Sequence, residues 1–200
     1  KGYLHDSGLR IPFILYDPRS KGAGPQVQRQ VVSATDITAT ILDLASAELP
    51  RYLTGQSLLN KSFNREYVFA ARDLWDEIME DSKGITSGRW KYIRNDMPEV
   101  PWEASQAYLE FYRPAVHVMR QLKLEGKLSP EEAAFFQPRK PLEELYDLKA
   151  DPEELFNLAA DPNYKRQLHR QRKITSRNDR KMKPVRADDE PTSAISVETL

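Results

Sequence analysis

The first ten residues carry side chains that suit chemistry on an anionic group. Lys1 offers a compact ammonium with three donors, which fits the oxygens of a tetrahedral oxyanion, although a solvated surface lysine is the other interpretation. His5 carries an imidazole that titrates near neutral pH and could donate a proton to a leaving group. Asp6 and Arg10 are four residues apart and opposite in charge, so we expect a structural ion pair or cap. Between them, Gly8 is expected to supply a backbone angle that a side chain would forbid.

A second polar cluster follows a strand-like run near residue 70. Five acids fall between residues 73 and 81. They form either a solvated surface or a rim that selects a ligand, in which the guanidinium of Arg72 would pair with an anionic group. The predicted rim residues are Arg72, Asp73, Asp76 and Glu77. Trp75 could stack on a sugar ring or belong to the core.

Composition limits the classes of function. The chain has 200 residues, with 30 Lys and Arg against 30 Asp and Glu, so its net charge is zero and no overall field favours nucleic acid. It has no Cys, which excludes disulfides and thiolate metal sites. No apolar run approaches the roughly 20 residues of a membrane span. Asp36 and Asp43 are interpreted as helix caps or helix-surface groups, and no metal ligand is predicted.

The first 60 residues are typical of the end of an α/β domain. The apolar run at residues 11–16 predicts a strand buried on both faces of a parallel sheet. A helix should follow from Ser33 or Thr35 to about residue 45, with Ile37, Ile41 and Leu44 on its buried face. Strand, loop and helix in this order indicate α/β architecture.

Residues 61–174 predict a smaller α+β domain with an antiparallel sheet. Strand-type residues occupy 66–71 and 83–95, with a hairpin turn at Gly88, and a last strand is expected over 142–148. A helical pattern over 104–125 should be kinked or split at Pro114. Ser129 and Pro130 predict a capped helix start, and Asp161 opens a final helix to about residue 173.

The C-terminal stretch is strongly basic. Ten Lys or Arg side chains fall within residues 165–186 against one acid, Asp179. We expect residues 175–200 to form a disordered basic tail. Such a run is either a solvated tail or a surface that attracts an anionic polysaccharide.

Several motifs, in this order, resemble type I sulfatases of the alkaline-phosphatase superfamily. The opening has Lys1, an acid five residues later, then Gly8, Arg10 and Pro12. The segment 33–45 is similar to a helix of that family, with Ala39 where Pro is usual. The other matching segments are 53–58, 88–93, 144–148, 151–154 and 157–159. Residues 67–77 and 91–98 look most like bacterial heparan N-sulfatase-like proteins.

The resemblance implies a sulfuric ester or sulfamate hydrolase, periplasmic or secreted, that acts on a sulfated carbohydrate such as a glycosaminoglycan. Lys1 would contact the substrate sulfate, and the rim around Arg72 would select the sugar. The family's calcium ligands and its formylglycine, made from Cys or Ser in a C/S-x-P-x-R motif, have no counterpart here. We therefore expect this chain alone to be inactive. The alternatives are a phosphodiester or phosphonate-monoester hydrolase of the same superfamily, and a non-enzymatic interaction module with a basic tail.

Overall fold

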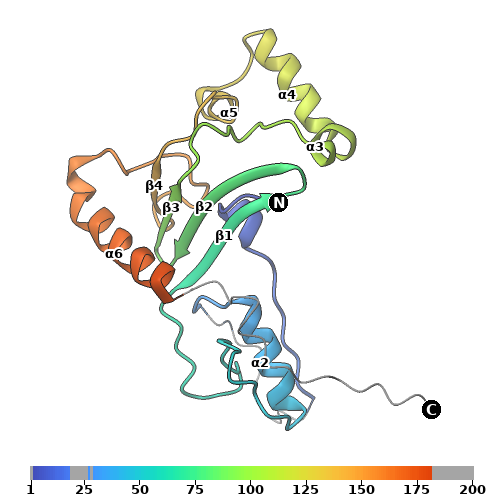
Figure 1. Ribbon diagram of the computed structural model, residues 1–200, viewed down its shortest axis with the longest axis vertical. Helices are drawn as coiled ribbons and strands as arrows, with labels where there is room; N and C mark the ends of the chain where they lie inside the picture. Colours follow the sequence, from blue (N-terminus) through green and yellow to red (C-terminus); the bar gives the residue numbers. More distant parts are fainter. Residues whose placement is uncertain (1, 19–26, 28, 182–200) are drawn as a thin grey trace, which may run out of the picture.

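The computed structural model describes residues 2–18, 27 and 29–181. Its centre is a four-stranded antiparallel sheet in the order β1-β2-β3-β4 (Figure 1). The strands are β1 (Val68–Trp75), β2 (Ile78–Thr86), β3 (Trp90–Asn95) and β4 (Glu143–Asp147). The α+β part with its antiparallel sheet is therefore confirmed, whereas the domain division at residue 60 stays a prediction.

The sheet is built from two short-range hairpins and one longer return. Gly88 lies in the turn between β2 and β3, where Thr86 pairs with Lys91, as the sequence predicts. The turn between β1 and β2 contains Asp76 with a φ of 50°. Such a left-handed angle suits Asp better than most residues, because its short side chain tolerates it. This hairpin extends beyond the rest of the sheet (Figure 1).

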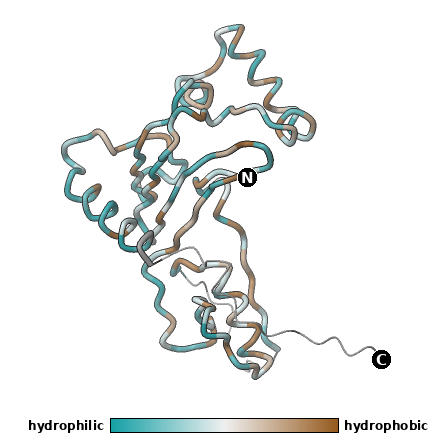
Figure 2. The backbone as a smooth tube through the Cα atoms, in the orientation of Figure 1, coloured by the Kyte–Doolittle hydropathy of each residue, from teal (hydrophilic) through white to brown (hydrophobic). Residues whose placement is uncertain are grey.

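Helix α6 (Lys165–Lys181) packs along the sheet after a short 3-10 turn, η1 (Pro162–Tyr164). Its Leu168 joins Ile85, Tyr92 and Leu145 of the strands in one buried cluster. The rest of α6 is mostly hydrophilic (Figure 2). The expectation of disorder from residue 175 is wrong for 175–181, because the buried Thr175 continues the helix face that packs on the core. Residues 182–200 lie outside the described part.

The region between β3 and β4 forms a small helical cap at one end of the sheet (Figure 1). Pro114 divides the expected long helix into α3 (Ala107–Tyr112) and α4 (Pro114–Leu124), because proline fits the first turn of a helix but not its interior. Helix α5 (Pro130–Ala134) starts at Ser129, whose side chain forms the expected cap with Glu132.

Helix α2 (Ala34–Leu44) lies away from the sheet, at the opposite end from the helical cap. Asp36 caps its N-terminus by accepting the backbone N–H of Ser33 at 2.8 Å, which confirms the capping role. The same buried carboxylate accepts the Gln56 N–H and a pair of bonds from Arg65. Burial alone would raise the pKa of Asp36, but these donors outweigh it and hold the pKa below its usual value. Contrary to expectation, Ile41 is exposed, because the buried face carries Ala39 and Thr40.

The predicted strand at residues 11–16 is wrong for this structure. These residues form no strand, and their apolar side chains are exposed, to 90% for Ile14. A buried parallel strand needs a hydrogen-bonded neighbour on at least one edge. The strands in the described part all belong to the β1–β4 sheet, which does not include this segment.

Candidate functional site

Residues 2–9, where the sequence predicts functional side chains, pack against the sheet. Leu4 is buried against Gly84 of β2, where a β-carbon at Gly84 would lie 3.4 Å from the Leu4 side chain. The Tyr3 hydroxyl donates to the carbonyl of Trp102 at 2.7 Å. Asp6 begins the short helix α1 (Asp6–Leu9). The segment is thus held by strand and loop residues far from it in sequence.

A buried lysine fixes the turn that follows His5. The Lys91 ammonium on β3 is 1% exposed and lies 2.5 Å from Asp6 Oδ1 and 2.8 Å from Glu154 Oε1. The other carboxylate oxygen of Glu154 accepts the Asp6 backbone N–H at 2.6 Å. The expected pairing of Asp6 with Arg10 is therefore wrong, because the buried Lys91 supplies the counter-charge and Arg10 is exposed.

Gly8 is required for a different reason from the one expected. Its backbone angle is not left-handed. Instead, a β-carbon at Gly8 would lie 2.2 Å from the carbonyl oxygen of Tyr3. Because that contact is with backbone, no side-chain rotation can relieve it, and glycine allows the chain to fold back on itself here.

His5 faces a buried carboxylate on β4. Its Nε2 lies 3.0 Å from Glu144 Oε2. Glu144 is fully buried and also accepts bonds from Asn95 Nδ2 and the Tyr146 hydroxyl, both at 2.7 Å. Burial opposes ionisation, yet the bonds from His5, Tyr146 and Asn95 lower the pKa of Glu144 below its usual value. Burial and the adjacent Glu144 charge raise the pKa of Tyr146.

These side chains enclose a polar cavity of about 10 Å³. Its lining includes Tyr3, His5, Ser82, Asn95 and Glu144. This volume suits one water and cannot admit a sugar ring. The contacts of His5 on this side therefore position the N-terminal segment, and the proton-donor role of His5 stays a prediction.

Arg72 also lies inside the molecule. Its side chain is 7% exposed, with Nε 3.0 Å from Glu80 Oε2. The guanidinium carbon lies 5.0 Å from the Tyr3 ring centroid and 4.6 Å from that of Trp75, so two aromatic faces cover it. Glu80 is paired with the buried Lys140 as well. In this arrangement Arg72 links the hairpin to Tyr3, and its guanidinium is not presented to a ligand.

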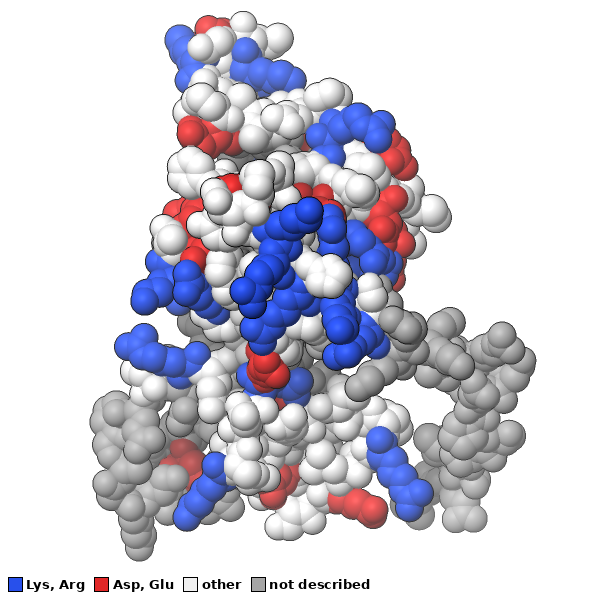
Figure 3. Space-filling model, turned by 90° about the vertical axis from the view of Figure 1, so that its left-hand side faces the viewer, with Lys and Arg blue, Asp and Glu red and all other residues white. Residues whose placement is uncertain are grey.

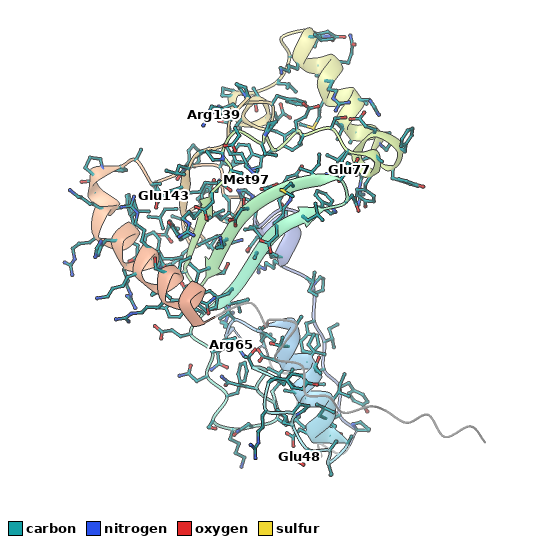
Figure 4. All side chains as sticks on the ribbon, viewed as in Figure 1. Glu48, Arg65, Glu77, Met97, Arg139 and Glu143 are labelled. Carbon is teal, nitrogen blue, oxygen red and sulfur yellow. The ribbon has the colours of Figure 1, made fainter. Side chains whose placement is uncertain are left out.

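The other predicted rim residues lie on the β1–β2 hairpin. Asp73, Asp76 and Glu77 are exposed. Glu77 points toward α3, where its carboxylate accepts the Ala107 backbone N–H at 2.6 Å (Figure 4). The structure therefore places the three acids at the exposed end of one hairpin, whereas the side chain of Arg72 is buried. Their role in substrate selection stays a prediction.

Lys1 lies outside the described residues, and its neighbour Gly2 packs on Trp75. Gly2 has a φ of 92°, and a β-carbon there would lie 2.3 Å from the Trp75 ring.

We expect Gly2→Ala to lower the free energy of unfolding by about 1–3 kcal/mol through backbone strain and to shift tryptophan emission. Urea denaturation followed by fluorescence measures both. Gly88→Ala, where the β-carbon would meet nothing within 4 Å, is the matched control. Equal effects of the two variants would contradict the proposed contact.

Sequence reasoning missed the buried charges that hold this segment. Lys91 and Glu144 were noted only as parts of motifs, yet both are fully buried. The available signal was a charged residue directly beside large apolar residues of a strand, since such a charge is buried only when paired. Glu80, Lys140 and Glu154 gave no comparable signal.

Two further findings concern the described residues alone. No three His, Asp or Glu side chains in that part of the chain lie close enough to hold a metal ion. The calcium that the resemblance implies therefore has no such ligand set among these residues. No helix there is both long and apolar enough to cross a bilayer.

Comparison with known proteins identifies the relatives of this chain. No protein-family model matches it. An ulvan-active sulfatase of Formosa agariphila is 36% identical over 154 residues, which cover 76% of this chain and 26% of that protein. The chain belongs to the sulfatase family. It corresponds to a C-terminal portion of a sulfatase, as the order of its motifs predicts.

More distant similarities cover less sequence or carry lower identity. Mouse arylsulfatase K is 33% identical over 103 residues, which is 45% of this sulfatase chain. A solved 2-O GAG sulfatase has 22% identity and a TM-score of 0.48 over 75% of this chain and 25% of its own. A phosphonate monoester hydrolase of Agrobacterium radiobacter has 20% identity and a TM-score of 0.44, covering 74% of this chain and 25% of its own. The chain spans about a quarter of the length of the ulvan-active sulfatases it matches.

Proposed function

We propose that the protein containing this chain hydrolyses a sulfate ester or sulfamate on a sulfated carbohydrate. The observation that carries the proposal is the 36% identity to an ulvan-active sulfatase over most of the chain. Negative charge builds on the sulfate oxygens and the leaving oxygen as the S–O bond breaks, so a fixed cation at that position lowers the barrier. We assign this role to the ammonium of Lys1.

The contacts of the next residues support this assignment. Gly2 packs on Trp75, His5 bonds to Glu144 and Asp6 pairs with Lys91. A cation stabilises developing charge best when its position is fixed before the reaction. The described contacts fix the segment that directly follows Lys1, and a fixed position of the Lys1 ammonium is part of the proposal.

The formylglycine and calcium of the family are not assigned to residues of this chain. The sequence contains no C/S-x-P-x-R motif, and the described residues offer no metal cluster. We propose that the 200 residues contribute substrate contacts and positioning, and that they do not turn over an aryl sulfate by themselves. Turnover by the isolated chain above that of its Lys1→Ala variant would refute this part.

The test of the main proposal uses the complete gene product that contains this chain. We expect Lys1→Ala to reduce kcat/KM for an aryl sulfate by about 10²–10³-fold, the effect of removing one oxyanion donor. Lys127→Ala removes a lysine that is 65% exposed and serves as the control. Preferential hydrolysis of an aryl phosphonate over the matching sulfate would favour the sister hydrolase. Absence of turnover on both would favour a non-enzymatic module.

The same assay separates the two roles considered for His5. A proton donor matters most when the leaving group is a poor one, because a good leaving group departs without protonation. If His5 donates the proton, His5→Gln lowers the rate for an alkyl sulfate far more than for p-nitrophenyl sulfate. If His5 positions the segment through Glu144, both substrates lose rate by a similar factor, which is the result we expect.

A further inference from the structure

Helix α6 carries a continuous basic stripe on its outer face. Leu168, Gln171 and Thr175 are buried and mark the side that packs on the sheet. On the opposite side, four basic residues recur at i, i+4, i+7 and i+11. They are Arg166, Arg170, Lys173 and Arg177, all exposed. With a rise of 1.5 Å per residue, the stripe is roughly 16 Å long. Figure 3 shows the Lys and Arg side chains gathered on this face.

Other described residues neutralise little of this charge. In the described part of the chain, Arg166, Lys173 and Arg177 have no acidic partner within 4 Å. Arg170 is the exception, since Glu66 lies 3.6 Å from its guanidinium. Mutually repelling cations on one helix face cost stability unless a ligand offsets them. As far as the described residues go, the stripe therefore presents three exposed cations without an acidic partner.

A groove borders the stripe at Arg170. It has a volume of about 370 Å³ and lies between α6 and the β2–β3 turn. Tyr67 and Trp90 contribute aromatic walls, and Gln167 and Gln171 contribute amides. Gln167 is half-buried and Gln171 is 2% exposed. An amide that lines a groove can both donate to and accept from a ligand hydroxyl.

We propose that the α6 stripe and this groove form an accessory binding surface for a sulfated polysaccharide chain. The free cations match sulfate groups spaced along a polymer. The aromatic walls suit the apolar face of a sugar ring, and the half-buried Gln167 amide suits a sugar hydroxyl. The choice of a sulfated glycan over another polyanion rests on the proposed function. The surface would tether the polymer at a place separate from the N-terminal segment 2–9.

The experiment measures binding of the 200-residue chain to dextran sulfate, with neutral dextran as the reference. Because charge neutralisation dominates the binding of a polyanion, removing three cations from its contact surface should weaken binding at least tenfold. The test variant is Arg166→Gln, Lys173→Gln, Arg177→Gln. The matched control, Arg51→Gln, Lys61→Gln, Arg139→Gln, removes the same charge from exposed residues elsewhere. We expect the control to stay within twofold of the parent and neutral dextran not to bind.

Three results would overturn the proposal. Equal weakening in both triple variants would mean that net charge alone attracts the polymer. Loss of binding on deletion of residues 182–200, with no effect of the α6 variant, would place the contact beyond the helix. Tighter binding of a single-stranded oligonucleotide than of dextran sulfate would assign the surface to nucleic acid. Because none of these readouts involves turnover, failure of the accessory site and failure of the proposed hydrolysis are distinguishable.

Discussion

Replacing Lys91 with alanine should destabilise the chain by about 3–5 kcal/mol, since it leaves two buried or half-buried carboxylates without a counter-charge. Asp6 and Glu154 both contact the Lys91 ammonium, within 2.8 Å. The loss should be greatest near the N-terminus, where Asp6 joins the segment 2–9 to the sheet. Urea denaturation gives the free energy of unfolding. Hydrogen exchange of the Gly8, Leu9 and Arg10 amides, which bond within this turn, shows whether the segment has detached.

The neighbouring strand supplies a matched control for Lys91. Lys83 pairs with Asp81 and Asp96 at the surface, where it is 28% exposed, and its replacement should cost less than about 1 kcal/mol. Lys91→Met keeps much of the buried volume, so a loss as large as that of Lys91→Ala would assign the effect to charge. Adding Asp6→Asn and Glu154→Gln to Lys91→Met should then recover stability. A small loss in Lys91→Ala, similar to Lys83→Ala, would contradict the anchoring role.

Local signals predicted much of this fold. Pro114 splits a helix because the ring cannot fit a helix interior. Ser33 and Asp36 cap the start of α2, and Gly88 lies in the β2–β3 turn. Both features were predictable because helix capping and turn formation depend on residues close in sequence. Helix-capping and turn preferences, which act over a few residues, were sufficient to predict these elements.

Residues that depend on distant partners were less predictable. The apolar run at 11–16 has the composition of a buried strand, but burial requires neighbours that the described residues do not provide. Asp6 found Lys91, 85 positions away, in place of Arg10, four positions away. Arg72 has the charge of a ligand contact, yet the fold buries it between Tyr3 and Trp75. In each case the residue type indicated the kind of contact to expect, but the sequence did not indicate which residue would be the partner.

Replacing Glu144, the buried partner of His5, should have the second large effect on stability. Glu144→Ala removes the oxygens that bind His5, Asn95 and Tyr146. Because buried donors left without a partner are costly, we expect a loss of about 3–5 kcal/mol in the free energy of unfolding. Glu144→Gln keeps one acceptor oxygen and should lose less. Glu131→Ala, at an exposed position on α5, is the control and should be nearly neutral.

Acid pH provides an independent check on Glu144. Its pKa is lowered in the folded chain, so its ionised form stabilises the fold above the ordinary carboxyl pKa of about 4.3. This contribution is lost as the pH falls through the lowered pKa of the folded state. The parent should therefore lose its stability advantage over Glu144→Gln as the pH falls from 7 to below 4. Urea denaturation of both proteins across this range measures the difference between their free energies of unfolding. Because both proteins contain the other carboxylates, the contributions of those groups cancel in this difference. A gap that stays constant with pH would mean that the pKa of Glu144 is the same in the folded and unfolded chain. A gap that grows as the pH falls would mean that the fold holds Glu144 as a neutral acid.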